Sequence, residues 1–126
     1  MRLLKSDQYQ LFVSAKPAAA IHFDAEWDKN LRTETRLKML EAEAALGEKV
    51  NFGEVDADAD ADGAIIQSIS KGWNVPLVVY YRDGQLVAAL IGVGQNVRDR
   101  VERVLRGEPI GYKDGTSSVR RQPTDP

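Results

Sequence analysis

The chain has 126 residues, of which 43% are apolar and 29% charged, and its formal net charge is -2. This length suits one domain, and the balance is that of a globular protein without the basic excess of a nucleic-acid binder. Cysteine is absent, which excludes thiolate nucleophiles, disulfide bonds and cysteine-ligated metals. We therefore expect no nucleic-acid partner and no thiol chemistry.

The amino terminus, Met1-Arg2-Leu3-Leu4-Lys5, reaches a charge within a few residues. The sequence contains no run of about eighteen apolar residues, the length that a membrane helix needs. These patterns predict neither a signal peptide nor a membrane span, so a cytoplasmic protein without a membrane partner is expected.

The first half of the chain predicts two helices alternating with two strands. A short helix begins near Ser6 and ends before Pro17. Residues 18–25 are mostly apolar and fit a central strand, and residues 50–55 fit a second one. Between them, residues 28–46 predict a long amphipathic helix that Gly47 ends. Its apolar residues form two adjacent rows, Leu37, Leu40 and Ala44 in one, and Thr35, Met39, Ala42 and Leu46 in the other.

The second half predicts a short helix, a hairpin and a last helix. The short helix covers residues 64–70, and apolar runs on both sides of Asp83-Gly84 predict two antiparallel strands. A helix from residue 97 follows and ends at Gly107. Its arginines, expected to face water, are Arg98, Arg100, Arg103 and Arg106. The predicted domain spans residues 1–107, and the polar residues 108–126 predict a flexible tail.

This order of elements, with parallel strands first and an antiparallel pair last, resembles the thioredoxin fold. Phe23-Asp24-Ala25-Glu26-Trp27 resembles the segment before the family's active site, and Val75-Pro76 resembles its cis-proline element. Asp83-Gly84 matches its hairpin turn and Gly92 the glycine after its last strand. The resemblance covers about residues 4–106. It implies an α/β, three-layer fold whose central mixed sheet of four to five strands is flanked by about four helices.

The resemblance fails at the redox motif. Where the family has C-G-P-C, this sequence has Asp28-Lys29-Asn30-Leu31, and thiol–disulfide exchange requires a thiolate. The chain is therefore predicted not to be a disulfide oxidoreductase, and neither a catalytic residue nor a cofactor is expected. Asp28 suits a helix cap; the alternative is that its carboxylate replaces the thiolate anion of the family at the helix N-terminus. Leu31 is expected to pack.

His22 is the single histidine of the chain. It falls where thioredoxins carry a buried aspartate that relays protons to the active-site sulfurs. Without sulfur that role is lost, so a hydrogen-bonded core histidine is the favoured interpretation. Acid–base or sensor chemistry near neutral pH is the alternative.

The acidic segment after the second strand contains Asp58, Asp60 and Asp62, followed by Gly63. This matches the first half of a calcium-binding loop, but Ile69 stands where such a loop has its bidentate glutamate. We therefore expect a solvated connection to the next helix, and these aspartates remain a weak metal-site candidate.

A peptide-binding surface is predicted around the former active-site mouth. In redox members of the family, the residue before the cis-proline pairs its backbone with an extended polypeptide, an interaction that needs no cysteine. The resemblance places six residues there, Trp27, Trp73, Asn74, Val75, Pro76 and Gly92. Aromatic side chains are enriched at binding hot spots, although plain packing of both tryptophans is the alternative.

Together these features predict a redox-inactive, thioredoxin-like protein that binds a protein partner or peptide segment, as an adaptor or assembly chaperone. Part of this rests on analogy of fold. The first alternative is a structural component that associates with itself as a homo-oligomer. The second is a cation-binding protein or non-thiol enzyme that uses His22 or the Asp58–Asp62 segment.

Overall fold

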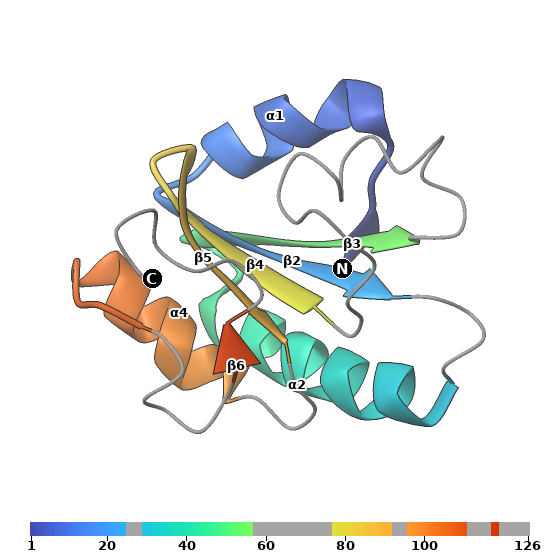
Figure 1. The fold of residues 1–126 in the computed structure, drawn as a ribbon. Helices are drawn as coiled ribbons and strands as arrows, with labels where there is room; N and C mark the ends of the chain where they lie inside the picture. The colour runs from blue at the N-terminus through green and yellow to red at the C-terminus, as the bar shows by residue number, and fades with distance from the viewer. Residues whose placement is uncertain (25–28, 57–76, 92–95, 111–116, 119–126) are drawn as a thin grey trace.

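The computed structural model describes residues 1–24, 29–56, 77–91, 96–110 and 117–118 (Figure 1). The elements in chain order are β1 (Arg2–Leu3), α1 (Ser6–Ser14), β2 (Ala18–Asp24), α2 (Lys29–Leu46), β3 (Val50–Asp56), β4 (Leu77–Arg82), β5 (Gln85–Ile91), α4 (Val97–Leu105) and β6 (Ser117–Ser118). No helix within these ranges is long and apolar enough to cross a membrane.

The strands form one mixed sheet in the order β1-β3-β2-β4-β5-β6. β3 is parallel to both β1 and β2, whereas β4 and β5 are antiparallel to their neighbours. The central position predicted for residues 18–25 is confirmed, because β2 lies between β3 and β4. The four longer strands match the predicted sheet, and the two-residue strands β1 and β6 extend its edges.

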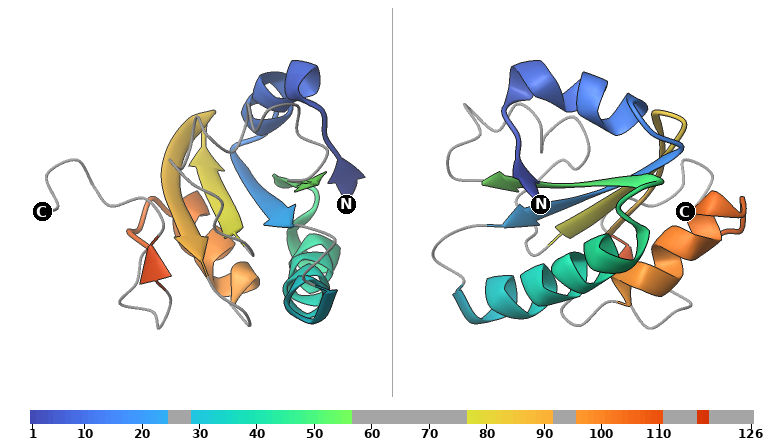
Figure 2. Two further views of the ribbon diagram at one scale, coloured as in Figure 1. Left: turned by 45° about the vertical axis from the view of Figure 1, so that its right-hand side comes forward. Right: turned by 180° about the vertical axis from the view of Figure 1, so that it is seen from behind.

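Helices cover both faces of the sheet, with α1 on one side and α2 and α4 on the other (Figure 2). The side chains of β2 contribute to the cores on both sides of the sheet, because successive side chains of a strand point to opposite faces. Ala19, Ile21 and Phe23 join the core under α1, while Ala18 and Ala20 join the core under α2 and α4. The predicted three-layer α/β architecture is confirmed, and the predicted helix at residues 64–70 lies outside the described residues.

The hairpin between β4 and β5 turns at Asp83-Gly84, as predicted. Both residues have positive φ, 51° at Asp83 and 79° at Gly84. A type I′ turn requires positive φ at its two central residues, and its twist matches that of the flanking strands. The short-range signal in the sequence therefore sets the register of the two residue pairs next to the turn, and the register shifts by one residue between Tyr80 and Tyr81.

The two apolar rows of α2 have different surroundings. Thr35, Met39 and Ala42 are buried against the sheet, whereas Leu37 is 61% and Leu40 40% exposed. The helix is amphipathic as predicted, but one of its apolar rows faces outward and remains accessible.

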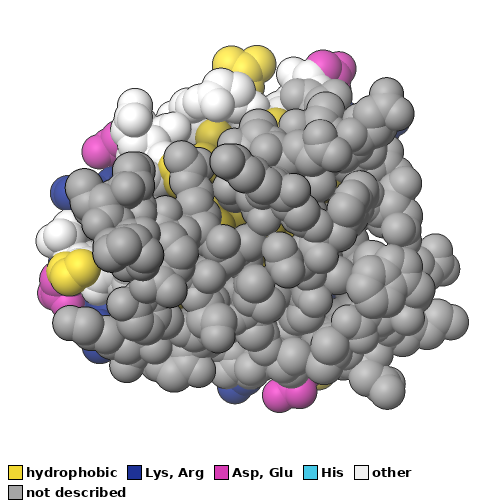
Figure 3. Space-filling view, in the orientation of Figure 1, with side chains coloured by type: hydrophobic (Ala, Val, Ile, Leu, Met, Phe, Trp, Pro, Cys, Tyr) yellow, Lys and Arg dark blue, Asp and Glu magenta, His cyan; other side chains and the backbone are white. Residues whose placement is uncertain are grey.

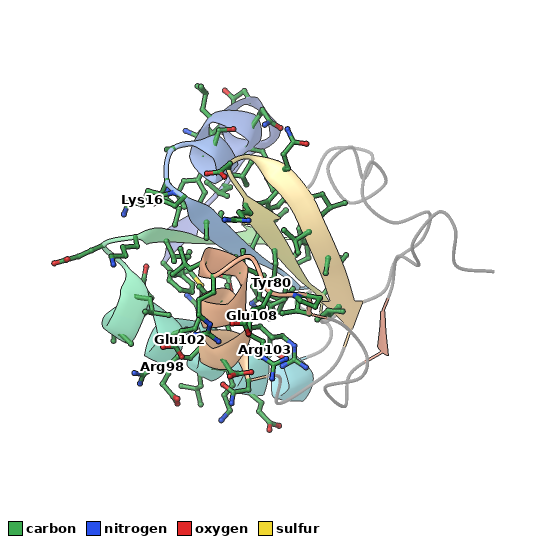
Figure 4. All side chains as sticks on the ribbon, turned by 90° about the vertical axis from the view of Figure 1, so that its left-hand side faces the viewer. Lys16, Tyr80, Arg98, Glu102, Arg103 and Glu108 are labelled. Carbon is green, nitrogen blue, oxygen red and sulfur yellow. The ribbon has the colours of Figure 1, made fainter. Side chains whose placement is uncertain are left out.

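The arginines of α4 do not all face water. Arg98 lies 4.0 Å from Glu102, and Arg103 lies 3.1 Å from Asp99, in exposed pairs one helical turn apart (Figure 4). Arg100 is only 2% exposed, so the prediction that it is solvated is wrong. Burial raises the pKa of Tyr80, while the positive charge of Arg100 opposes this rise. The Tyr80 phenol therefore stays protonated at physiological pH.

Gly107 ends α4 in the left-handed conformation, with φ of +75°. Its N–H donates to the Val104 carbonyl at 3.0 Å, and a Cβ atom there would meet Arg82 Nη1 at 2.8 Å. We expect Gly107→Ala to lower the free energy of unfolding by about 1–2 kcal/mol, since Ala is strained at positive φ. Gly107→Asn, which tolerates this conformation better, is the control in urea unfolding. Equal losses in both variants would point to the contact with Arg82 as the cause.

Beyond Gly107, the described residues are 108–110 and the two residues of β6. Ser117 pairs with Ile91 and Ser118 with Leu90 of β5. The other residues of the predicted tail lie outside the described ranges, so both its flexibility and the domain boundary at residue 107 stay predictions.

Candidate functional site

Three strands meet at one end of the sheet. Asp24 and Asp56, the last residues of β2 and β3, are register partners. Leu77, the first residue of β4, pairs with Phe23. The chain therefore leaves β2 and β3, and enters β4, at the same end. In parallel strands of α/β proteins this carboxyl end is where ligands usually bind.

A buried hydrogen-bonded pair lies just below this end. His22 on β2 and Glu54 on β3 are register partners, and His22 Nδ1 lies 3.3 Å from Glu54 Oε2. His22 is 0% and Glu54 6% exposed. An ionised carboxylate can only accept hydrogen bonds, so a hydrogen bond to Glu54 in that form requires the proton of His22 on Nδ1. In neutral His22 this leaves Nε2 as the basic nitrogen.

Arg36 connects this pair to the surface. Its Nη2 atom lies 3.7 Å from Glu54 Oε1, and the Arg36 side chain is 46% exposed against 9% for that of Glu54. A half-exposed ion pair at this distance contributes little by itself to the stability of the fold.

Two buried polar atoms near α2 have unused hydrogen-bonding capacity. His22 Nε2 and the hydroxyl oxygen of Thr35 have no hydrogen-bond partner among the residues that the structure describes. Both residues belong to the layer between the sheet and α2 and are fully buried. A basic nitrogen held by a carboxylate is a chemically competent arrangement for acid–base work. Its complete burial, however, keeps it from the surface of the described structure.

The sequence pointed to His22 but missed Glu54. The favoured interpretation of His22 as a core histidine agrees with its burial and its contact with Glu54. A role for Glu54 could have been suspected, because it is a charged residue between Gly53 and Val55 in a strand that is predicted to be buried. Its partner could not, because it lies 32 residues away in the sequence.

Most residues of the predicted surface lie outside the described ranges. This applies to the degenerate motif residues Trp27 and Asp28, to the binding residues Trp73, Asn74, Val75, Pro76 and Gly92, and to the metal candidates Asp58, Asp60 and Asp62. Lys29, Asn30 and Leu31 form the first turn of α2, so the helix begins directly after Asp28, where the capping prediction needs it. Within the described part of the chain, no group of three or more His, Asp or Glu side chains could hold a metal.

Comparison with solved structures identifies the fold. The zinc-bound form of human ERp44 is similar at a TM-score of 0.65 and 18% identity, over 82% of this chain and 31% of that one. Malassezia sympodialis thioredoxin, Mala s 13, gives a TM-score of 0.64 at 18% identity over 86% of this chain and 90% of its own. A structure from work on yeast mitochondrial 1-Cys peroxiredoxin gives 0.64 at 19% identity, over 85% and 94%.

This chain thus spans less than a third of the ERp44 chain, but nearly all of the two smaller ones. No protein-family model and no curated protein matches the sequence. The strand order and layers described above agree with these structural neighbours. The chain therefore has the thioredoxin-like fold, in a form that contains no cysteine and hence no CxxC motif.

Proposed function

We propose that this protein is a redox-inactive binding module, an adaptor or assembly chaperone that holds an extended segment of another protein. The observation that carries the proposal is the complete absence of cysteine from a thioredoxin-like fold. Disulfide exchange needs an attacking thiolate, whereas binding of an extended chain needs only free backbone groups and side-chain pockets. Binding of an extended chain therefore does not depend on the missing cysteines.

The position of the strand ends supports this proposal. Trp27 follows β2 by three residues, and Trp73 to Pro76 directly precede β4 in the sequence. β2 ends and β4 begins at the same end of the sheet, because Phe23 pairs with Leu77. We propose that a bound segment lies at this end, with its backbone paired to residue 75 and its side chains against the two tryptophans.

The buried pair has a structural role in this proposal. His22 and Glu54 are covered on the α2 side and expose almost nothing to a partner. Their hydrogen bond connects β2 to β3 two register pairs before the last pair, Asp24 with Asp56. We propose that it holds the two strand ends in place beneath the binding surface, and that the protein is not an enzyme.

Affinity capture followed by a direct binding measurement tests the proposal. The variants are Trp73→Ala/Val75→Asp and, as a control on α1, Leu11→Ser, whose leucine is 78% exposed. Proteins retained from native lysate are identified by mass spectrometry, and the bound segment is then titrated as a synthetic peptide. We expect the double variant to lose about 30-fold or more in affinity, since a hot spot contributes about 2 kcal/mol.

The control variant should bind like the wild type. Retention of the same proteins with the same peptide affinity by the double variant would show that this end of the sheet is not the binding surface. An insulin-reduction assay should show no acceleration by the protein, because no thiol is present.

A further inference from the structure

The outward face of α2 carries an apolar stripe in the middle of the helix. Leu37 is 61% exposed, Leu40 is 40% exposed, and Ala44 is exposed beside them. Residues three and four apart in a helix lie next to each other on one face. Met39 and Ala42, buried against the sheet, lie on the opposite side of the helix. We call Leu37, Leu40 and Ala44 the α2 stripe.

The charges along α2 are arranged in two halves of opposite sign. Residues 29–38 contain four basic residues, Lys29, Arg32, Arg36 and Lys38, and one acidic residue, Glu34. Residues 39–46 contain two acidic residues, Glu41 and Glu43, and no basic residue. The sign changes at the α2 stripe.

This order of charges disfavours the isolated helix. The helix dipole favours acidic residues near the N-terminus and basic residues near the C-terminus. The first turn of α2 contains no acidic residue and its last turn no basic one. The helix dipole therefore does not account for the charge pattern.

We propose that a second copy of this chain docks on the α2 stripe, with the two α2 helices antiparallel. A two-fold axis near residues 38 and 39 sets the basic half of each helix against the acidic half of the other. It also brings Leu37 of one copy against Leu40 of the second copy. Both dipoles then run in opposite directions, which adds to the attraction. The charges that oppose the dipole of their own helix are therefore paired at two symmetric places in the dimer.

Intramolecular contacts hold two charges beside the stripe. The 3.7 Å contact with Glu54 holds Arg36, and the amino group of Met1 pairs with Glu43 at 2.8 Å. In an antiparallel pair these two positions face each other across the axis. On the other flank Glu34 faces Glu41 of the second copy, so Glu34→Lys strengthens an antiparallel dimer. A parallel pair would not bring Glu34 against Glu41, so the same change would give no such gain.

The dimer is weak and reversible. Two leucines and one alanine per copy form a smaller apolar core than the roughly 1,200–2,000 Å² interfaces of stable complexes. Much of the attraction comes from exposed charges, which salt screens within a Debye length of about 8 Å at physiological ionic strength. Association therefore weakens as the salt concentration rises.

Sedimentation equilibrium of the full chain over a wide concentration range measures this association. Leu37→Ser/Leu40→Ser should raise the dimer dissociation constant about tenfold or more, from the loss of about 1.4 kcal/mol or more of apolar burial. Leu11→Ser, which removes a leucine of α1 that is 78% exposed, should leave it unchanged. Figure 3 shows hydrophobic side chains exposed over this helix. A wild type that stays monomeric overturns the proposal. A dissociation constant that is unchanged in the double variant, or that does not change with salt concentration, overturns it as well.

Charge exchange identifies the partner as a second copy. Arg36→Glu/Lys38→Glu makes the helix acidic in both halves, and Glu41→Lys/Glu43→Lys makes it largely basic. Each variant alone should remain monomeric, whereas their equimolar mixture should restore a dimer with one copy of each. A mixture that remains monomeric contradicts the α2 arrangement, and Glu34→Lys distinguishes antiparallel from parallel pairing. Failure here leaves the peptide-binding proposal untouched, because the α2 stripe includes none of the residues proposed to bind the peptide.

Discussion

His22→Leu is expected to destabilise the fold by about 3 kcal/mol, because it leaves the Glu54 carboxylate buried without its imidazole partner. Glu54 is 6% exposed, so water does not replace the lost hydrogen bond. Arg36 compensates only in part, since its contact with Glu54 is 3.7 Å long and half in solvent. Glu54→Met should cost about 1–3 kcal/mol, the penalty for leaving a buried histidine nitrogen unpaired.

The double variant His22→Leu/Glu54→Met provides the sharper test. Replacement of a whole buried pair by apolar side chains of similar volume is often neutral. The double variant should therefore lose much less than the sum of the single losses in urea unfolding. As a control, Arg98→Met breaks an exposed pair with Glu102 and should cost no more than about 0.5 kcal/mol. Strictly additive losses at His22 and Glu54 would mean that the two side chains are not coupled.

Local patterns in the sequence predicted the larger elements of the fold. The Asp83-Gly84 turn, the apolar run of β2 and the periodicity of α4 depend on residues close in sequence, and each lies where it was expected. β1 was missed, because two residues carry no period of their own. It forms where the Leu4 N–H donates to the Glu54 carbonyl at 2.8 Å, a contact that only the folded sheet provides.

Burial of single side chains could not be predicted in the same way. α2 has apolar residues in two rows, and periodicity identifies the helix without saying which row the sheet covers. In the folded protein the row that contains Met39 and Ala42 packs against the sheet, and Leu37 stays exposed. Arg100 looked like its exposed neighbour Arg98, but the position of α4 against the sheet buries it.

The candidate site shows the same division. His22 could be recognised as a buried histidine from the apolar run around it, whereas its pairing with Glu54 depends on strand register. The loss of thiol chemistry follows from composition alone. The roles of Trp27, Trp73, Val75 and Pro76 rest on the family resemblance and stay predictions, to be decided by the capture experiment.

Gly53 on β3 leaves no room for a side chain beneath α1, and Gly53→Ala tests how tightly that layer is packed. A Cβ atom at residue 53 would lie 2.7 Å from Leu4 Cδ1, 2.9 Å from the Phe12 ring and 3.2 Å from Ile21 Cδ1. All three distances are shorter than ordinary carbon contacts of about 3.5–4.0 Å. Overpacking of this kind costs about 1–3 kcal/mol, which chemical denaturation of the variant would measure.

A compensating cavity separates overpacking from other effects of the same change. Leu4 is 4% exposed, so Leu4→Ala alone should cost about 2–5 kcal/mol through lost burial and the space it leaves. In Gly53→Ala/Leu4→Ala the new methyl group enters part of that space, so the double variant should lose clearly less than the sum. Because α1 is also tied to β3 by the hydrogen bond from Asn51 Nδ2 to the Phe12 carbonyl at 2.9 Å, the helix cannot simply move away to make room. Additive losses would show instead that α1 shifts as a unit, and that Gly53 does not set its distance from the sheet.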